Sequence, residues 1–272
     1  MGSTATLGTE HARPLVIQAR SLYREPAVET RECRVTAMKR LSGHVLELKL
    51  KPDQRLHYCP GQYIEVLMEN GRLRPFSIAN APHVSGVLEL HVRFYHEGLF
   101  SRFAFTELRE GEVLRIRGPY GHVRLREETD RPAIFIAGGT GFAPIKSLIE
   151  QALRRATERP LYVYWGARAA QNLYMDELPR AWSDTYPQLR YVPVLSEPAT
   201  SDHWRGRTGL VHEAVLQDFS EFSPYQVYAA GPPLMVQAVR ESLFARGLKQ
   251  ECFFSETFEP ANDRLSLGAC RT

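Results

Sequence analysis

The sequence predicts two domains, an antiparallel β-barrel followed by an α/β domain with a parallel sheet. Between residue 31 and residue 125, short strand-like runs recur with turn residues between them, which is typical of an all-β barrel. Beyond residue 132 the pattern changes to alternating strands and helices, which indicates a parallel sheet covered by helices. A charged stretch that ends in Pro132 separates the two patterns and is expected to be a linker.

The first domain is expected to span residues 31–128, after a leader formed by residues 1–30. Apolar and polar side chains alternate in its clearest strands, which are residues 45–50, 87–93 and 113–117. One helix, residues 101–108, is expected within the barrel.

The second domain is expected to span residues 129–260 and to be followed by a tail, residues 261–272. Its strands are predicted at residues 133–137, 161–165, 190–194 and 226–230. The helical stretches between and after them are residues 144–156, 173–182, 210–217 and 233–246. In such a sheet, ligands bind at the carboxyl ends of the strands.

The composition is that of an ordinary soluble protein, with 43% hydrophobic and 24% charged residues among 272. A net charge of +3 is too small to indicate nucleic-acid binding. No apolar run is long enough to span a membrane, and no secretory signal pattern opens the chain, so we expect a cytoplasmic protein. Its four cysteines are scattered, without the C-x4-C-x2-C run of a plant-type [2Fe–2S] site, and no metal site is predicted.

A glycine cluster follows the strand that ends at Ala137. Gly138, Gly139 and Gly141 precede Pro144, which suits the first turn of a helix. Glycines allow the backbone to approach a pyrophosphate closely, and the free N–H groups of a helix start favour its negative charge. The spacing differs from G-x-G-x-x-G, so the cluster alone is compatible with either a dinucleotide site or a purely structural turn.

A second motif, Arg74-Pro75-Phe76-Ser77, lies between two strand-like runs. Arg74 can form a bidentate contact with a phosphate, and the flat ring of Phe76 can cover a flavin or an adenine. Ser77 can donate or accept a hydrogen bond at a flavin ring nitrogen. The alternative for this segment alone is a strand with an exposed arginine and a core phenylalanine.

The two motifs in this order resemble the ferredoxin–NADP reductase superfamily over nearly the whole chain. Five further segments follow in the family's order, namely residues 164–168, 193–198, 206–209, 228–235 and 254–259. The chain looks most like the reductase portions of NADH-dependent oxygenase reductases and of CDP-6-deoxyhexose (glucoseen) reductases, and it is also similar to bacterial NAD(P)H:flavin reductases. Residues 13–20 resemble the segment that joins a ferredoxin domain to the barrel in such relatives, although a plain leader with a short strand is an equal alternative.

In the barrel, the resemblance implies that Arg74 lies at the FAD pyrophosphate, Phe76 against the flavin and Ser77 near flavin N5, with Pro75 also part of the cofactor site. The strand that follows is implied to contribute the backbone of His91, Val92 and Arg93, with the His91 side chain half exposed. The loop of Gly98, Phe100 and Ser101 fits the family's Gly-x-x-Ser turn, in which Ser101 would cap a helix beside the FAD diphosphate. A plain capping serine is the alternative.

In the α/β domain, the resemblance implies that Gly139, Thr140 and Gly141 face the nicotinamide and its pyrophosphate, with Gly138 also part of the cofactor site. Trp165, Gly166 and Arg168 are implied at the adenosine half, and Gly231, Pro232 and Met235 at the second wall of the pocket. Relatives commonly carry cysteine where this chain has Ala230. The residues implied in catalysis are Phe76, Ser77, Thr140, Phe258 and Glu259.

These implications predict an FAD-dependent NAD(P)H reductase that uses NADH, with NADPH possible, and passes electrons to a separate iron–sulfur protein. That acceptor would be a ferredoxin, an oxygenase component or a deoxysugar dehydratase component. The first alternative is an NAD(P)H:flavin reductase that releases reduced flavin to a monooxygenase. The second is an FAD-bound sensor without turnover, which only Ala230 favours.

Overall fold

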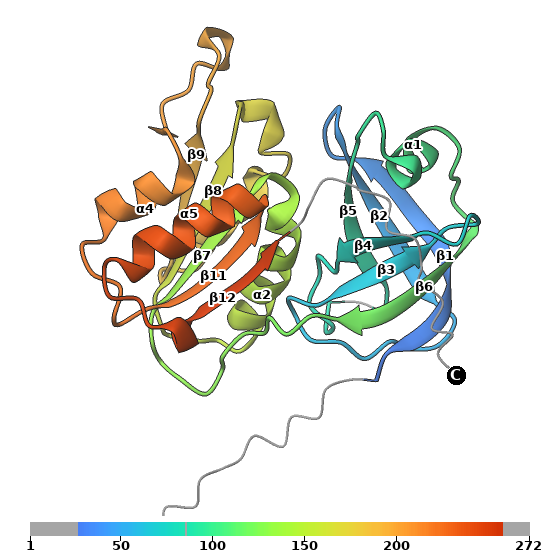
Figure 1. Cartoon of the computed structure of the whole chain (residues 1–272), viewed down its shortest axis with the longest axis horizontal. Helices are drawn as coiled ribbons and strands as arrows, with labels where there is room; N and C mark the ends of the chain where they lie inside the picture. The colour runs from blue at the N-terminus through green and yellow to red at the C-terminus, as the bar shows by residue number, and fades with distance from the viewer. Residues whose placement is uncertain (1–26, 85, 258–272) are drawn as a thin grey trace, which may run out of the picture.

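The computed structural model describes residues 27–84 and 86–257, which form two sheets with a helical layer between them (Figure 1). The first 26 residues, Ser85, and residues 258–272 lie outside this description. The predicted tail and most of the predicted leader therefore lie outside it as well.

The first sheet has six antiparallel strands in the order β4-β3-β6-β1-β2-β5. These strands are β1 (Glu29–Arg40), β2 (Val45–Pro52), β3 (Tyr63–Leu67), β4 (Leu73–Ser77), β5 (Leu88–Arg93) and β6 (Val113–Tyr120). Just beyond β4, Ile78 bridges Leu90 of β5, and the Ala79 N–H donates to the Glu89 carbonyl at 2.7 Å. Because β4 and β5 are the two outer strands, these contacts close the sheet into the predicted barrel.

The barrel core follows from the alternation of side chains along its strands. On β2, Leu46, Leu48 and Leu50 are buried in the barrel core, whereas Glu47 and Lys49 between them are only half buried. Helix α1 (Leu99–Thr106) adds Phe100 and Ala104 to the same core.

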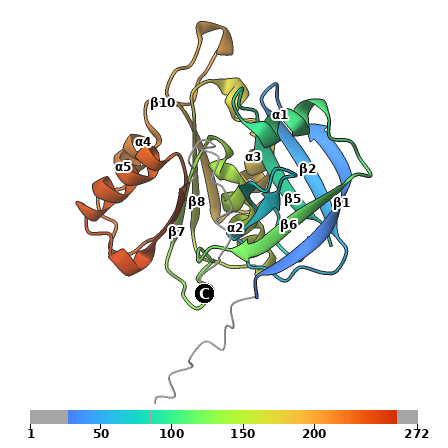
Figure 2. The ribbon, with the colours of Figure 1, turned by 45° about the vertical axis from the view of Figure 1, so that its right-hand side comes forward.

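The second sheet has six parallel strands in the order β10-β9-β8-β7-β11-β12. They are β7 (Ala133–Gly138), β8 (Leu161–Ala167), β9 (Leu189–Leu195), β10 (Arg207–Thr208), β11 (Gln226–Gly231) and β12 (Phe253–Thr257). Helices α2 (Phe142–Arg154) and α3 (Glu177–Thr185) pack on the face toward the barrel, and α4 (Val211–Asp218) and α5 (Pro233–Phe244) cover the other face (Figure 2). This arrangement is the predicted α/β domain.

The predicted helix at residues 173–182 is wrong at its start. Residues 170–172 form a separate 3-10 turn, and α3 begins only at Glu177. The reason is Pro179, which has no backbone N–H and is tolerated in the first turn of a helix but not in its interior. Pro144 shows the same restriction, because it is the third residue of α2 rather than its first.

The connection between the sheets, residues 121–132, has no helix or strand and is fixed by a buried arginine. The Arg159 guanidinium donates to the carbonyl oxygens of Arg126 at 3.0 Å and Thr129 at 3.3 Å, and to Gln226 Oε1 at 3.2 Å. These bonds tie the predicted linker to β11. Over the described ranges, no helix has the length and apolar character needed to cross a membrane.

Candidate functional site

The glycine cluster forms a tight turn between β7 and α2 at the carboxyl edge of the parallel sheet. Gly139 to Gly141 make one 3-10 turn, and Gly139 has a φ of +53°, a conformation that favours glycine. A Cβ atom on Gly141 would lie 2.1 Å from the Ala230 carbonyl oxygen. Glycine is therefore required at Gly141 by close backbone approach to β11.

Gly138 and Gly231 end the neighbouring strands β7 and β11. A Cβ on Gly138 would lie 2.4 Å from the sulfur of Met235, and one on Gly231 would lie 3.1 Å from the backbone of Gly138. Pro232 is exposed at the start of α5 and lies beside Gly138. The structure thus brings the predicted second wall, Gly231, Pro232 and Met235, against the glycine turn.

Trp165 of β8 packs behind the glycine turn and forms a hydrogen bond with it. Its ring is fully buried, stacks on Phe142 at 3.9 Å between centroids, and donates from Nε1 to the Gly139 carbonyl at 3.0 Å. The side chain therefore belongs to the core and acts on the turn, although the sequence suggested a place beside the adenosine. Gly166 is half buried, and Arg168 is exposed with its Nε 3.9 Å from Glu197.

The motif residues of β4 have distinct environments. Arg74 is buried, and burial together with the neighbouring Arg72 lowers the pKa of its guanidinium, which favours an anion beside it. Pro75 is exposed, and the half-buried Phe76 packs against Phe100 with 5.0 Å between ring centroids.

Ser77 is buried, with 7% of its surface exposed, and its hydroxyl has no hydrogen-bond partner among the described residues. A buried hydroxyl without a partner costs free energy, so a ligand atom that bonds to it would be favoured. This hydroxyl and the glycine turn both fit the flavin and nicotinamide groups that the sequence suggests.

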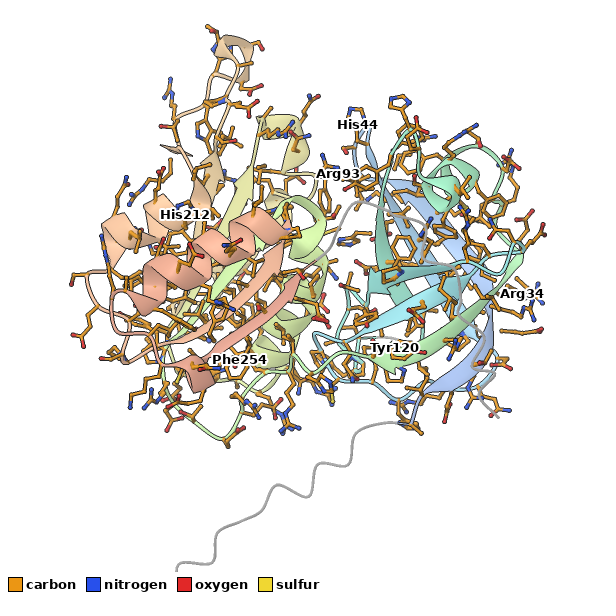
Figure 3. The ribbon with its side chains drawn as sticks, in the orientation of Figure 1. Arg34, His44, Arg93, Tyr120, His212 and Phe254 are labelled. Atoms are coloured by element: carbon orange, nitrogen blue, oxygen red, sulfur yellow. The ribbon has the colours of Figure 1, made fainter. Side chains whose placement is uncertain are left out.

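Strand β5 places its three predicted residues differently. Val92 is in the barrel core, and Arg93 is exposed and points toward the α/β domain (Figure 3). The Arg93 Nη1 lies 3.3 Å from the position of a Cβ on Gly139. The prediction that His91 is half exposed is wrong: it is 5% exposed, because Tyr174 of the α/β domain covers it.

The capping role predicted for Ser101 is also wrong. Gly98 is the N-cap of α1, and Ser101 is its third residue. The Ser101 hydroxyl lies 3.0 Å from the Gly98 carbonyl and accepts from the Tyr95 N–H at 3.1 Å, so it closes the loop before the helix. Thr140 is half buried in the turn, while Phe258 and Glu259 lie outside the described residues.

Sequence reasoning missed Glu256, which lies on β12 opposite Ala230. Burial raises the pKa of its carboxyl group, and nearby His122 partly counters that effect. Its Oε1 lies 2.9 Å from the position of a Cβ on Gly121, at the end of the barrel. The terminal motif contained this residue, but only the pairing of β12 with β11 turns it toward the junction of the two domains.

Two family models match the chain. The oxidoreductase FAD-binding domain matches residues 32–125, and the oxidoreductase NAD-binding domain matches residues 135–241. These ranges correspond to the barrel and to most of the α/β domain.

Similar proteins include several reductases. The chain is 42% identical over 217 residues to the CDP-6-deoxy-L-threo-D-glycero-4-hexulose-3-dehydrase reductase of Yersinia pestis, covering 80% of this chain but only 64% of that protein. It is 40% identical over 233 residues to protein RfbI of Salmonella typhimurium, covering 85% and 69%. It is 34% identical over 226 residues to the xylene/toluene monooxygenase electron transfer component XylA of Pseudomonas putida, covering 82% and 64%.

Among solved structures, the Amycolatopsis cytochrome P450 reductase GcoB is similar, with a TM-score of 0.81 and 28% identity. That match covers 86% of this chain and 71% of GcoB. The ferredoxin reductase in carbazole 1,9a-dioxygenase has a TM-score of 0.76 and 28% identity, with coverage of 85% and 70%.

Proposed function

The chain belongs to the ferredoxin–NADP reductase superfamily and is an oxidoreductase with domains for FAD and NAD, and from this premise we propose its reaction and its partner. It transfers hydride from NAD(P)H to FAD and then delivers single electrons to a separate iron–sulfur protein. Residues 31–128 are the FAD-binding domain in this proposal, and residues 129–260 are the NAD(P)-binding domain.

One observation carries the proposal. The Arg93 guanidinium on the barrel comes within 3.3 Å of the position of a Cβ on Gly139, in the turn of the α/β domain. The strand proposed to hold the flavin and the turn proposed to hold the nicotinamide are therefore neighbours. Direct hydride transfer needs such proximity, because the donor and acceptor atoms must be in contact.

The barrel residues have separate proposed roles toward FAD, which when bound supplies a hydride acceptor that releases electrons singly. Arg74 binds the pyrophosphate as a buried cation, and Phe76 covers one face of the ring system. Ser77 offers its otherwise unbonded hydroxyl to a ring nitrogen. Gly98 to Ser101 and the backbone of β5 complete the binding site.

The α/β residues bind and orient the nicotinamide nucleotide in the proposal. The backbone of Gly138 to Gly141 admits the pyrophosphate because no side chain occupies that space. Thr140 contacts the carboxamide, and Met235 with Gly231 and Pro232 forms the opposite wall. The exposed end of β8, with Gly166 and Arg168, receives the adenosine half.

The relatives' names support a protein acceptor. They are a dehydrase reductase and a monooxygenase electron transfer component, each of which serves another protein. The acceptor in our proposal is an iron–sulfur protein, either a ferredoxin or an oxygenase or dehydratase component. Release of reduced flavin to a monooxygenase is the alternative outcome of the test.

The test is a visible spectrum of the desalted chain before and after anaerobic addition of NADH or NADPH, followed by addition of a [2Fe–2S] ferredoxin. We expect retained flavin that bleaches with NADH and is reoxidised by the ferredoxin. Arg74→Met should lose the flavin, whereas Arg115→Met, an exposed arginine of β6, should keep it. A colourless chain that oxidises NADH only with added free flavin would contradict the proposal and support flavin release.

A further inference from the structure

A buried ionic network joins the barrel to helix α2, on the face of the sheet that meets the barrel. At its centre is Lys146, which is 5% exposed. Its ammonium group donates to Glu150 Oε1 at 2.7 Å, to Glu89 Oε1 at 3.1 Å and to the Ala79 carbonyl at 3.3 Å. An ammonium group has three N–H donors, so all three are used. Two of the acceptors belong to the barrel.

The network continues from Glu89 to a second contact between the domains. His91 Nε2 lies 2.9 Å from Glu89 Oε1, and its Nδ1 lies 2.8 Å from the Tyr174 hydroxyl. Burial alone raises the pKa of Glu89, but the His91 hydrogen bond and the Lys146 charge outweigh it and lower that pKa to about 2. Glu89 is therefore an ionised acceptor, and His91 donates to it from Nε2.

Tyr174 keeps its proton, because burial and the charge of Glu89 raise its pKa well above the usual value. Its hydroxyl can therefore donate to Nδ1 of His91. The Tyr174 hydroxyl, both His91 ring nitrogens, Glu89 Oε1 and the Lys146 ammonium group then each have a partner, and a buried network whose groups are paired in this way favours one geometry.

Helix α2 also forms hydrogen bonds with the segment that follows β4. The Ala81 N–H donates to Glu150 Oε2 at 2.8 Å, and the Ser147 hydroxyl donates to the Asn80 carbonyl at 2.8 Å. Together with the bond from Lys146 to Ala79, three consecutive residues are bound by one turn of α2. This segment begins two residues after Ser77.

The position of the network relates it to both halves of the site. Ala79 follows Ser77 by two residues, and His91 precedes Arg93 by two residues on β5. Lys146 lies five residues after Gly141, in the second turn of the helix that the glycine turn begins. A displacement of Lys146 relative to Glu89 would therefore move the turn relative to β4 and β5.

We propose that Lys146 is a positioning residue for hydride transfer. By binding Glu89 and Ala79 of the barrel, it sets the distance between the flavin-binding strands and the turn that receives the nicotinamide. The inference rests on the function proposed above and goes beyond it, since it assigns the alignment of the two domains to one ion pair outside the cofactor contacts.

Physical reasoning favours alignment over stability as the role of the pair. Replacing a buried ion pair with well-packed apolar residues is often neutral or stabilising, because the desolvation of two charges offsets their attraction. An apolar contact, however, does not fix the relative orientation of the two groups. Two hydrogen bonds from one ammonium group to the barrel, with the third held by Glu150 on the same helix, fix both the distance and the angle between the helix and the barrel.

The test compares Lys146→Met with Lys49→Met, a half-buried lysine on β2 that pairs with Glu47 on the same strand. Flavin content, melting temperature and the rate constant of flavin reduction at saturating NADH are measured on flavin-loaded protein. We expect Lys146→Met to retain flavin and to lower the rate constant about 10- to 100-fold, the loss that a misplacement near 1 Å produces. Lys49→Met should match the wild type, and Lys146→Arg should recover part of the rate.

If Lys146→Met does not fold, Glu89→Gln tests the same link from the barrel side, because it removes the charge with little change in shape. A variant that keeps its flavin and reduces it at the wild-type rate overturns the inference. A change confined to melting temperature, with an unchanged rate constant, also overturns it. If the wild type itself does not reduce its flavin with NADH, the proposed function fails instead, so the two failures are distinguishable.

Discussion

Gly141→Ala is the sharpest test of how the glycine turn is built. The added Cβ would lie 2.1 Å from the Ala230 oxygen, 2.5 Å from the Ala230 carbonyl carbon and 2.8 Å from the Gly231 nitrogen. All three atoms are backbone, so no side-chain rotation relieves the contact. The turn and the strand must separate by about 1 Å to restore van der Waals distance.

Strand β11 cannot move away from the turn easily. Ala230 lies on β11, which is paired with β7 on one side and with β12 on the other. The displacement therefore falls on the turn and on the start of α2. Overpacking of this kind costs about 1–3 kcal/mol, and a shift near 1 Å at a reacting group lowers a rate constant about 100-fold.

The matched control is Gly43→Ala, because a Cβ at Gly43 meets nothing within 4 Å. Urea denaturation followed by tryptophan fluorescence gives the stability of both variants, and stopped-flow reduction of bound flavin by NADH gives the rate. We expect Gly141→Ala to lose both stability and rate, and Gly43→Ala to lose neither. Equal denaturation midpoints and equal rate constants for the two variants would refute the reasoning.

Three other outcomes follow from single contacts. Ser77→Ala should not lower stability, because the hydroxyl has no partner among the described residues, yet it should slow flavin reduction about 10- to 100-fold in a stopped-flow assay, the value of one hydrogen bond to a developing charge. Trp165→Phe removes the bond to Gly139, should cost about 1–3 kcal/mol of stability and should lower the rate of flavin reduction more than it raises the KM for NADH. Trp182→Phe, in the same aromatic cluster, should leave the rate and the KM unchanged. The pKa of Glu89 is lowered from 4.5 to about 2, so folding is about 3 kcal/mol more favourable with this carboxyl group ionised than with the same group protonated. That contribution is complete above pH 4.5 and is lost as the pH falls toward 2, so urea titrations of wild type should weaken in this window and those of Glu89→Gln should change less.

The sequence pattern predicted the features that are formed by contiguous residues. The change from recurring strands to alternating strands and helices located both sheets, since each element carries its own periodicity. The glycine turn was predictable for the same reason, because the residues that form it are contiguous and each has a backbone role. Pro179 also marks the start of α3 in the sequence, because proline is tolerated in the first turn of a helix but not in its interior.

Contacts between the domains were not predictable in this way. Along β5, Glu89, His91 and Arg93 occupy alternate positions and have the pattern of a solvated strand face. Packing of α2 and Tyr174 against that face converts it into a buried network. No residue near β5 in the sequence indicates that Lys146 will pair with Glu89. Burial of a polar residue by a distant element has no local signal, so His91 was assigned the wrong exposure.

Trp165 illustrates a related limit. The position of a residue at the end of a parallel strand suggests a ligand contact. Successive side chains along a strand point to opposite faces of the sheet, however, so position alone does not give the direction of one side chain. Trp165 faces α2, where it stacks on Phe142, and only its hydrogen bond to Gly139 reaches the site. The rule about strand ends gives the expected place of the site, while the direction of each side chain depends on register.

These contacts show that the glycine turn is held from three directions by groups outside the proposed cofactor contacts. Trp165 of β8 holds the Gly139 carbonyl, Ala230 of β11 limits Gly141, and Lys146 ties the following helix to the barrel. A turn that is fixed before the nucleotide arrives loses little conformational freedom on binding, so more of the binding free energy is available for alignment. The separation between the nicotinamide and the flavin should therefore be set by core packing and by the ion pair between the domains, which is why substitutions at these three positions should lower the rate more than they lower affinity for the nucleotide.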